Sequence, residues 1–160
     1  MALREIVKFG EDVLRKKCRP VTAFDGKLAM LLDDLAETLL ASDGVGLAAP
    51  QVGILRRVAV VNVRDKRGTI ELVNPEIISE EGVQVGNEGC LSAPNEWCEV
   101  ERPNEVTVKA FDRNGNEFTI TGTELLARAF CHEIDHLDGI LFTDRVKKTL
   151  PGQGAQGGRS

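Results

Sequence analysis

Between residues 57 and 121 the chain carries one strand-type segment after another, each either rich in valine or alternating between apolar and polar residues. Such segments are typical of β-strands. The four segments are Arg57–Val63, Thr69–Ile78, Glu105–Phe111 and Glu117–Thr121. Asp112–Gly115 joins the last two, and its Asn-Gly pair predicts a hairpin turn. Because the strands follow one another without alternating helices, the pattern favours an α+β fold with an antiparallel sheet. Pro75 should place the later half of its segment at a sheet edge or in a turn.

A helix is predicted on either side of this block of strands. Leucines three and four residues apart predict a helix over Lys27–Ser42, with Asp25 as its N-cap. A second helix is predicted over Glu124–Leu137, with Thr123 as its N-cap and Gly139 as its terminator.

Length and composition exclude several classes of protein. A chain of 160 residues suits one domain, which we place at residues 1–150, before a flexible glycine-rich tail at 151–160. A net charge of −5 argues against a dedicated nucleic-acid binder. No apolar run approaches the roughly 18 residues of a membrane span, and the first ten residues do not resemble a secretory signal. We therefore expect a cytoplasmic protein whose cysteines are reduced.

Both histidines of the chain lie in His132-Glu133-Ile134-Asp135-His136, an H-E-x-x-H motif on the second predicted helix. At about 100° per residue, His132 and His136 lie about 40° apart on one helix face. Glu133 lies about 60° beyond His136, at the edge of that face. Two neutral imidazoles beside a carboxylate are typical of a zinc or iron(II) site in which the carboxylate acts as a base for water.

The third protein ligand that a hydrolytic metal site needs is not decided by spacing. A carboxylate, Cys18, Cys90 and Cys98 all remain candidates. Cys90 has the most suitable local sequence, because the glycine before it permits an unusual turn and the amide after it could point at a substrate. Cys18 lies in a basic run and is expected to be a surface thiol, whereas Cys98 is expected to serve in ordinary packing.

Three segments, in this order, resemble the bacterial peptide deformylase family, and the resemblance covers roughly residues 1–148. The family shows G-x-G-L-A-A-x-Q, E-G-C-L-S and Q-H-E-x-D-H-L-x-G. This chain carries GVGLAAPQ at Gly44–Gln51, EGCLS at Glu88–Ser92 and CHEIDHLDG at Cys131–Gly139. Cys131 stands where the family pattern has Gln, but it faces away from the two histidines on the helix, so we expect no change in the chemistry. The family fold implies antiparallel or mixed sheets packed around a central C-terminal helix that carries H-E-x-x-H.

The resemblance implies a metal-dependent hydrolase that removes the N-formyl group from N-formylmethionyl polypeptides and releases formate. Cys90, His132 and His136 would bind one divalent metal ion per chain, usually iron(II), with zinc, nickel or cobalt as replacements. Glu133 would take a proton from the attacking water and later deliver it to the leaving amine. The Leu91 amide and the Gln51 side chain would stabilise the developing oxyanion.

The substrate is expected to lie along the same helix face. Gly46 and Gly89 would offer backbone hydrogen bonds to the peptide, in the manner of an added strand. Leu125 and Ala129 fall at about 20° and about 60° from His132 on the helix. We therefore expect both to line the methionine pocket together with Val45.

The remaining predictions concern the ion pair that supports Cys90, the partners of the protein and two alternative functions. Glu88 and Arg102 are expected to pair and brace the loop that carries Cys90. The partners are formylmethionyl nascent chains, with a transient ribosome contact, no membrane, no dedicated nucleic-acid site and a monomeric state. Two alternatives are a zinc peptidase of the H-E-x-x-H type and a non-enzymatic metal-binding domain. The segments around Gln51 and Cys90 argue against the peptidase.

Overall fold

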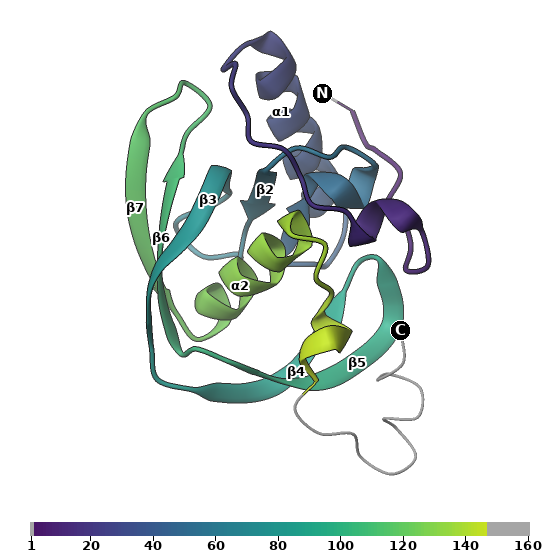
Figure 1. Cartoon of the computed structure of the whole chain (residues 1–160), viewed down its shortest axis with the longest axis vertical. Helices are drawn as coiled ribbons and strands as arrows, with labels where there is room; N and C mark the ends of the chain where they lie inside the picture. Colours follow the sequence, from purple (N-terminus) through teal and green to yellow (C-terminus); the bar gives the residue numbers. More distant parts are fainter. Residues whose placement is uncertain (1, 147–160) are drawn as a thin grey trace.

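Two antiparallel sheets and two α-helices make up residues 2–146, the part of the chain that this computed structural model describes (Figure 1). The larger sheet has the strand order β1-β2-β3-β6-β7, and β4 pairs with β5 in the smaller one. The strands are β1 Gly46–Ala48, β2 Val58–Val61, β3 Ile70–Glu81, β4 Gln84–Cys90, β5 Ala93–Arg102, β6 Glu105–Phe111 and β7 Glu117–Thr123. The predicted α+β class is confirmed. The predicted tail at 151–160 and the domain limit at residue 150 lie outside the described residues.

The helices α1 (Gly26–Leu40) and α2 (Leu125–Leu137) cover opposite faces of the larger sheet. Strand β2 shows why, because all four of its residues are buried. Val58 and Val60 belong to the core packed on α1, whereas Val61 belongs to the core packed on α2. Successive side chains of a strand point to opposite faces, so the continuous apolar run of β2 serves both helices. Figure 1 shows α2 between the larger sheet and the β4–β5 ribbon.

Helix α1 begins at Gly26, one residue before the predicted start at Lys27. The carboxylate of Asp25 accepts a hydrogen bond from the Leu28 amide at 3.1 Å, which confirms the predicted N-cap. The predicted leucine stripe is buried and lies in the core with β1 and β2. Burial of each such side chain contributes about 1.5–3 kcal/mol. The helix ends at Leu40, two residues before the predicted end at Ser42.

Strand β3 continues through Pro75 to Glu81, and its later half pairs on one side only, which agrees with the predicted edge position. Residues 70–73 pair with β2, whereas the ladder with β6 runs from Val73 to Glu81 and shifts register between Val73 and Glu76. Pro75 therefore lies where β3 leaves β2 and keeps a single partner in this sheet. A residue without a backbone N–H is tolerated at such an irregular edge position.

Strands β4 and β5 are not among the sequence-based predictions. Their sequences, QVGNEGC and APNEWCEVER, contain Gly, Asn and Pro, which have weak β-propensity. The two strands pair from Gln84–Arg102 to Cys90–Ala93, with a register shift after Glu88. This ribbon carries Cys90 at the end of β4 and brings it to α2.

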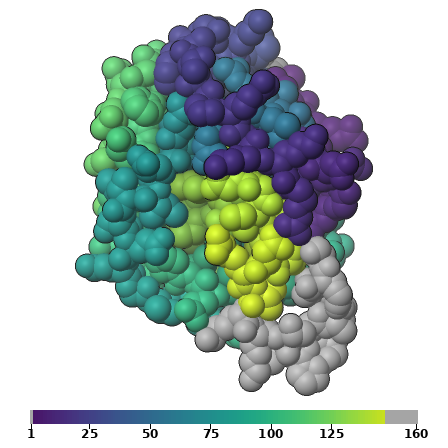
Figure 2. Space-filling model, in the orientation of Figure 1, coloured from purple at the N-terminus to yellow at the C-terminus, as the bar shows by residue number. Residues whose placement is uncertain are grey.

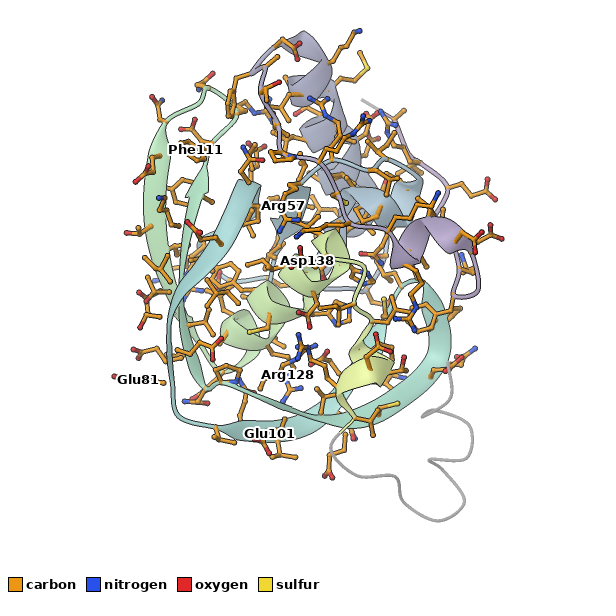
Figure 3. The ribbon with its side chains drawn as sticks, in the orientation of Figure 1. Arg57, Glu81, Glu101, Phe111, Arg128 and Asp138 are labelled. Carbon is orange, nitrogen blue, oxygen red and sulfur yellow. The ribbon has the colours of Figure 1, made fainter. Side chains whose placement is uncertain are left out.

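The start of helix α2 differs from the prediction. Thr123 is not the N-cap, because it still belongs to β7 and pairs with Glu105 of β6. Glu124 alone joins β7 to α2, with φ 55° and ψ −121° and no side-chain cap. The end is as predicted, because Gly139 adopts φ 75°, which favours glycine. There Arg57 binds the Leu137 carbonyl and the Asp138 carboxylate at 3.0 and 2.9 Å, and Figure 3 shows both side chains at this helix end.

The N-terminal segment packs against the segment that follows α2, as the purple and yellow surfaces in Figure 2 show. The 3₁₀ helices η1 (Asp12–Arg15) and η3 (Phe142–Arg145) lie in these two segments, and a third, η2 (Ala49–Val52), accepts a hydrogen bond from the Val7 amide through the Gln51 carbonyl. Arg15 of η1 pairs with Asp144 of η3 at 2.6 Å. The expectation that Cys18 is a surface thiol is wrong: its amide binds the Leu137 carbonyl, its side chain is buried, and burial raises its pKa to about 11. Among the described residues no helix is long and apolar enough to span a membrane.

Candidate metal centre and adjoining pocket

Three metal-ligating side chains converge where β4 meets α2. Cys90 ends β4, and His132 and His136 project from one face of α2. One ligand atom from each lies within 4.8 Å of the other two, and Cys90 Sγ lies 3.4 Å from His136 Nε2. Cys90 thus joins the histidine pair, whereas Cys18 and Cys98 pack in other clusters. A thiolate with two imidazoles fits a borderline-soft divalent ion such as zinc or iron(II). Burial lowers the pKa of His136, which keeps its ring neutral and able to bind such an ion.

Glu88 holds His132 in place from the side away from the ligand cluster. Its Oε1 lies 2.8 Å from His132 Nδ1, so His132 is left with Nε2 for a metal. Arg102 binds both Glu88 oxygens, at 2.9 and 2.6 Å, which confirms the predicted pairing. Arg128 adds a third contact at 2.7 Å, and Figure 3 shows its side chain between α2 and the β4–β5 ribbon. Burial works against the charge of Glu88, but the hydrogen bonds from Arg102 and His132 outweigh it and hold its pKa well below the ordinary range.

The same ionic network continues to the end of the described chain. Arg102 also binds Asp135 at 2.9 Å, and Arg145 of η3 binds the same carboxylate at 2.6 Å. Phe142 of η3 packs near the ring of His132, with 5.8 Å between ring centroids. The orientation of His132 therefore depends on β4, β5 and η3 together, as is usual for a metal-ligating histidine that is held by its outer contacts.

Glu133 is buried beside the three candidate ligands. The sequence places it at the edge of the ligand face, and the structure leaves it only 2% exposed. Its Oε2 lies 4.0 Å from His132 Nε2, and its Oε1 has no hydrogen-bond partner among the described residues. Burial raises the pKa of Glu133 to about 7. A carboxyl group with a pKa near neutrality can both accept and return a proton.

Gln51 reaches the site from the other side of Cys90. Its carbonyl oxygen accepts the Ala48 amide at 2.9 Å, which turns its amide nitrogen toward the site. That nitrogen lies 3.1 Å from Ser92 Oγ and 3.6 Å from Cys90 Sγ. Gln51 is buried, whereas Leu91, which follows Cys90, is half-buried and lines the adjoining pocket.

A pocket of about 430 Å³ opens beside these residues. Cys90, His132 and Glu133 are among the residues that line it. All the residues predicted to bind substrate line it as well: Val45, Gly46, Gly89, Leu125 and Ala129. Gln51 and His136 are not among the lining residues and reach the site through Cys90.

Comparison with known proteins decides which family this site represents. Residues 3–151 match the family model for polypeptide deformylase. The chain belongs to the polypeptide deformylase family. It is 54% identical over 157 residues to the peptide deformylase of Caldanaerobacter subterraneus, covering 98% of each chain. It is 52% identical over 148 residues to peptide deformylase 1 of Bacillus subtilis, covering 92% of each.

Solved structures agree with this assignment. A crystal structure of a peptide deformylase from Legionella pneumophila superposes with a TM-score of 0.90 and 43% sequence identity, covering 98% of this chain and 92% of that one. The family resemblance drawn from the sequence is therefore confirmed.

Two residues of this deformylase's site are missing from the sequence-based predictions. Arg128 lies four residues before His132, on the face of α2 that carries the histidines, and a charged residue at that position could have indicated a buried ionic partner. Ser92, which contacts the Gln51 amide, ends the EGCLS segment of the family resemblance, but its residue type indicates no role, because serine is common in turns.

Proposed function

We propose that Cys90, His132 and His136 hold one divalent metal ion with which this deformylase hydrolyses the N-formyl group of N-formylmethionyl peptides. The products are formate and a peptide with a free N-terminal methionine. One observation carries the proposal: three ligand atoms lie within 4.8 Å of one another, next to a buried carboxylate whose Oε1 has no partner among the described residues.

The protein's own residues then have separate tasks. A bound divalent ion supplies Lewis acidity toward the formyl carbonyl and the attacking water. Glu133 accepts a proton from that water and returns it to the methionine nitrogen as the C–N bond breaks, which its pKa of about 7 supports. The Gln51 amide and the Leu91 backbone N–H donate hydrogen bonds to the oxygen on which negative charge develops.

The pocket orients the substrate. Val45, Leu125 and Ala129 offer apolar side chains to the methionine, and all three line the pocket that Glu133 also lines. Gly46 and Gly89 would bind the peptide backbone as an added strand would, because Gly46 starts β1 and Gly89 is the residue before the end of β4, both beside the site.

We propose iron(II) as the resident ion, with zinc, nickel or cobalt as replacements, because a thiolate and two imidazoles suit all four. The proposed substrates are nascent chains, which the enzyme would reach in the cytoplasm as a monomer in transient contact with the ribosome.

Formate release from formyl-Met-Ala-Ser by anaerobically purified protein tests the proposal, with metal content measured on the same sample. We expect release with about one metal ion per chain and none from the unformylated peptide. Cleavage of the unformylated peptide would instead indicate a zinc peptidase. No release from a folded sample that contains iron or zinc would refute the proposed activity.

Gly46→Ala is expected to lower formate release strongly while the protein stays folded. A Cβ at residue 46 would lie 2.7 Å from Cδ and Cγ of Glu133, which real Cβ atoms do not tolerate, so the carboxylate must move. A displacement of about 1 Å at a catalytic group can lower the rate about a hundredfold. Gly26→Ala is the matched control, because nothing lies within 4 Å of a Cβ at that position. Wild-type kcat in Gly46→Ala would show that Glu133 needs no fixed position.

A further inference from the structure

The exposed side chain of Trp97 is not used by the proposed reaction. Trp97 lies on β5 and is 63% exposed, although large aromatic side chains usually gain by burial. Its neighbour Cys98 is buried in the core on the opposite face of the strand. Trp97 nevertheless lines the same pocket as Cys90 and Glu133. An exposed aromatic ring at the mouth of a pocket is a candidate contact for a ligand.

The ring of Trp97 is exposed but held in a defined place. A Cβ built on Gly89 would meet its Cη2 and Cζ3 atoms at 2.9 Å, so the ring rests on the Cα of Gly89. Gly89 directly precedes Cys90 and is one of the two glycines proposed to bind the peptide backbone. One face of the ring therefore lies on the peptide-binding strand, and the other faces solvent. Because the ring is already held in place, little side-chain entropy is lost when a ligand binds to it.

A second exposed apolar side chain lines the same pocket. Leu125, the first residue of α2, is 49% exposed and lines this pocket as Trp97 does. An extended peptide advances about 3.3 Å per residue. A peptide that binds to β4 at Gly89 as an added strand places the residues after the methionine beside Trp97, because the Trp97 ring rests on Gly89.

We propose that Trp97 forms an aromatic subsite for the first two residues after the formylmethionine and gives this enzyme a preference for apolar side chains there. This inference rests on the proposed function and names the substrate class more closely. Its physical basis is the area that an apolar side chain and the Trp97 ring bury together, because tryptophan side chains that a ligand covers often contribute strongly to binding.

Substrate selectivity tests the subsite. We would compare formyl-Met-X-Ser and formyl-Met-Ala-X, with X as Ala, Leu or Phe, in the wild type, Trp97→Ala and Trp97→Phe. In at least one series we expect Trp97→Ala to lower the preference in kcat/KM for Leu or Phe over Ala about tenfold, through KM. Trp97→Phe should keep most of it. Val83→Ala removes a 65% exposed side chain that does not line the pocket and should keep the wild-type ratio.

Fluorescence supplies a readout that does not depend on turnover. Trp97 is the single tryptophan of a chain without tyrosine, so intrinsic emission reports on this ring alone. In zinc-loaded Glu133→Gln protein we expect formyl-Met-Ala-Phe or formyl-Met-Phe-Ser to shift the emission to shorter wavelength. An unchanged selectivity ratio in Trp97→Ala, or unchanged emission with peptides that the wild type deformylates, would overturn the subsite. Absence of formate release from every peptide would instead refute the proposed function.

Discussion

Glu133→Gln is expected to lower kcat for formate release at least a hundredfold while the variant still binds one metal ion per chain. The amide fits the same space but can neither accept the proton of the attacking water nor return it to the amine, and such proton transfers contribute about 10²–10⁴ in rate. The side chain is 2% exposed, and burial raises its pKa to about 7, so its charge is costly in the folded protein. A carboxyl whose pKa is raised by folding opposes folding above its unfolded pKa, so Glu133→Gln should not lower Tm at neutral pH.

The measurement is kcat with formyl-Met-Ala-Ser, together with metal content and Tm on the same preparations. Glu37→Gln makes the same chemical change at an exposed position of α1 and should behave as the wild type. A turnover above a hundredth of the wild-type value in Glu133→Gln would remove Glu133 from the proposed role. A variant that has lost the metal would show instead that Glu133 acts as a ligand or holds one.

Glu88→Gln is expected to destabilise the protein by about 3–5 kcal/mol and to weaken metal binding ten- to a hundredfold. The side chains of Glu88 and Arg102 are 5% and 3% exposed, and Arg128 contacts the same carboxylate. Loss of the central charge leaves two buried guanidinium groups without their shared partner. It also weakens the contact that leaves Nε2 of His132 available to a metal.

Urea denaturation of the metal-free proteins would give the free energies of unfolding, and competition with a chelator would give the metal affinities. Glu99→Gln changes a half-buried carboxylate on the neighbouring strand and serves as the control. A loss below 1 kcal/mol would mean that water or other groups solvate the two arginines once Glu88 is neutral.

The parts of this fold that follow from local periodicity are those the sequence predicts. The leucine stripe of α1, its Asp25 cap and the β6–β7 hairpin all depend on patterns within one short stretch of sequence. Strands β4 and β5 do not, because their stability comes from their pairing and from Glu88, Arg102 and Arg128, which meet only in the folded chain. Residue types alone therefore indicate a loop there.

Some features of the candidate site are likewise predictable from local sequence, and others are not. The helix arithmetic places His132 and His136 on one face, because four residues make about one turn. Nothing in the spacing chooses among the cysteines: the glycine before Cys90 favours it, and the resemblance to a family assigns it as the ligand. The Trp97 ring packs on Gly89 where the pairing of β4 and β5 is irregular. No sequence pattern therefore reveals this contact.

Because a single residue joins β7 to α2, the sheet fixes how the helix is rotated about its own axis. Glu124 follows Thr123, which is still paired to β6, and precedes the first residue of α2. One inserted residue would turn every side chain of α2 by about 100° relative to β7. Either the histidine pair would then lose Cys90, or the apolar face would lose its contact with the sheet. Insertions at this joint should therefore abolish function in a way that no compensating change of a ligand residue can restore.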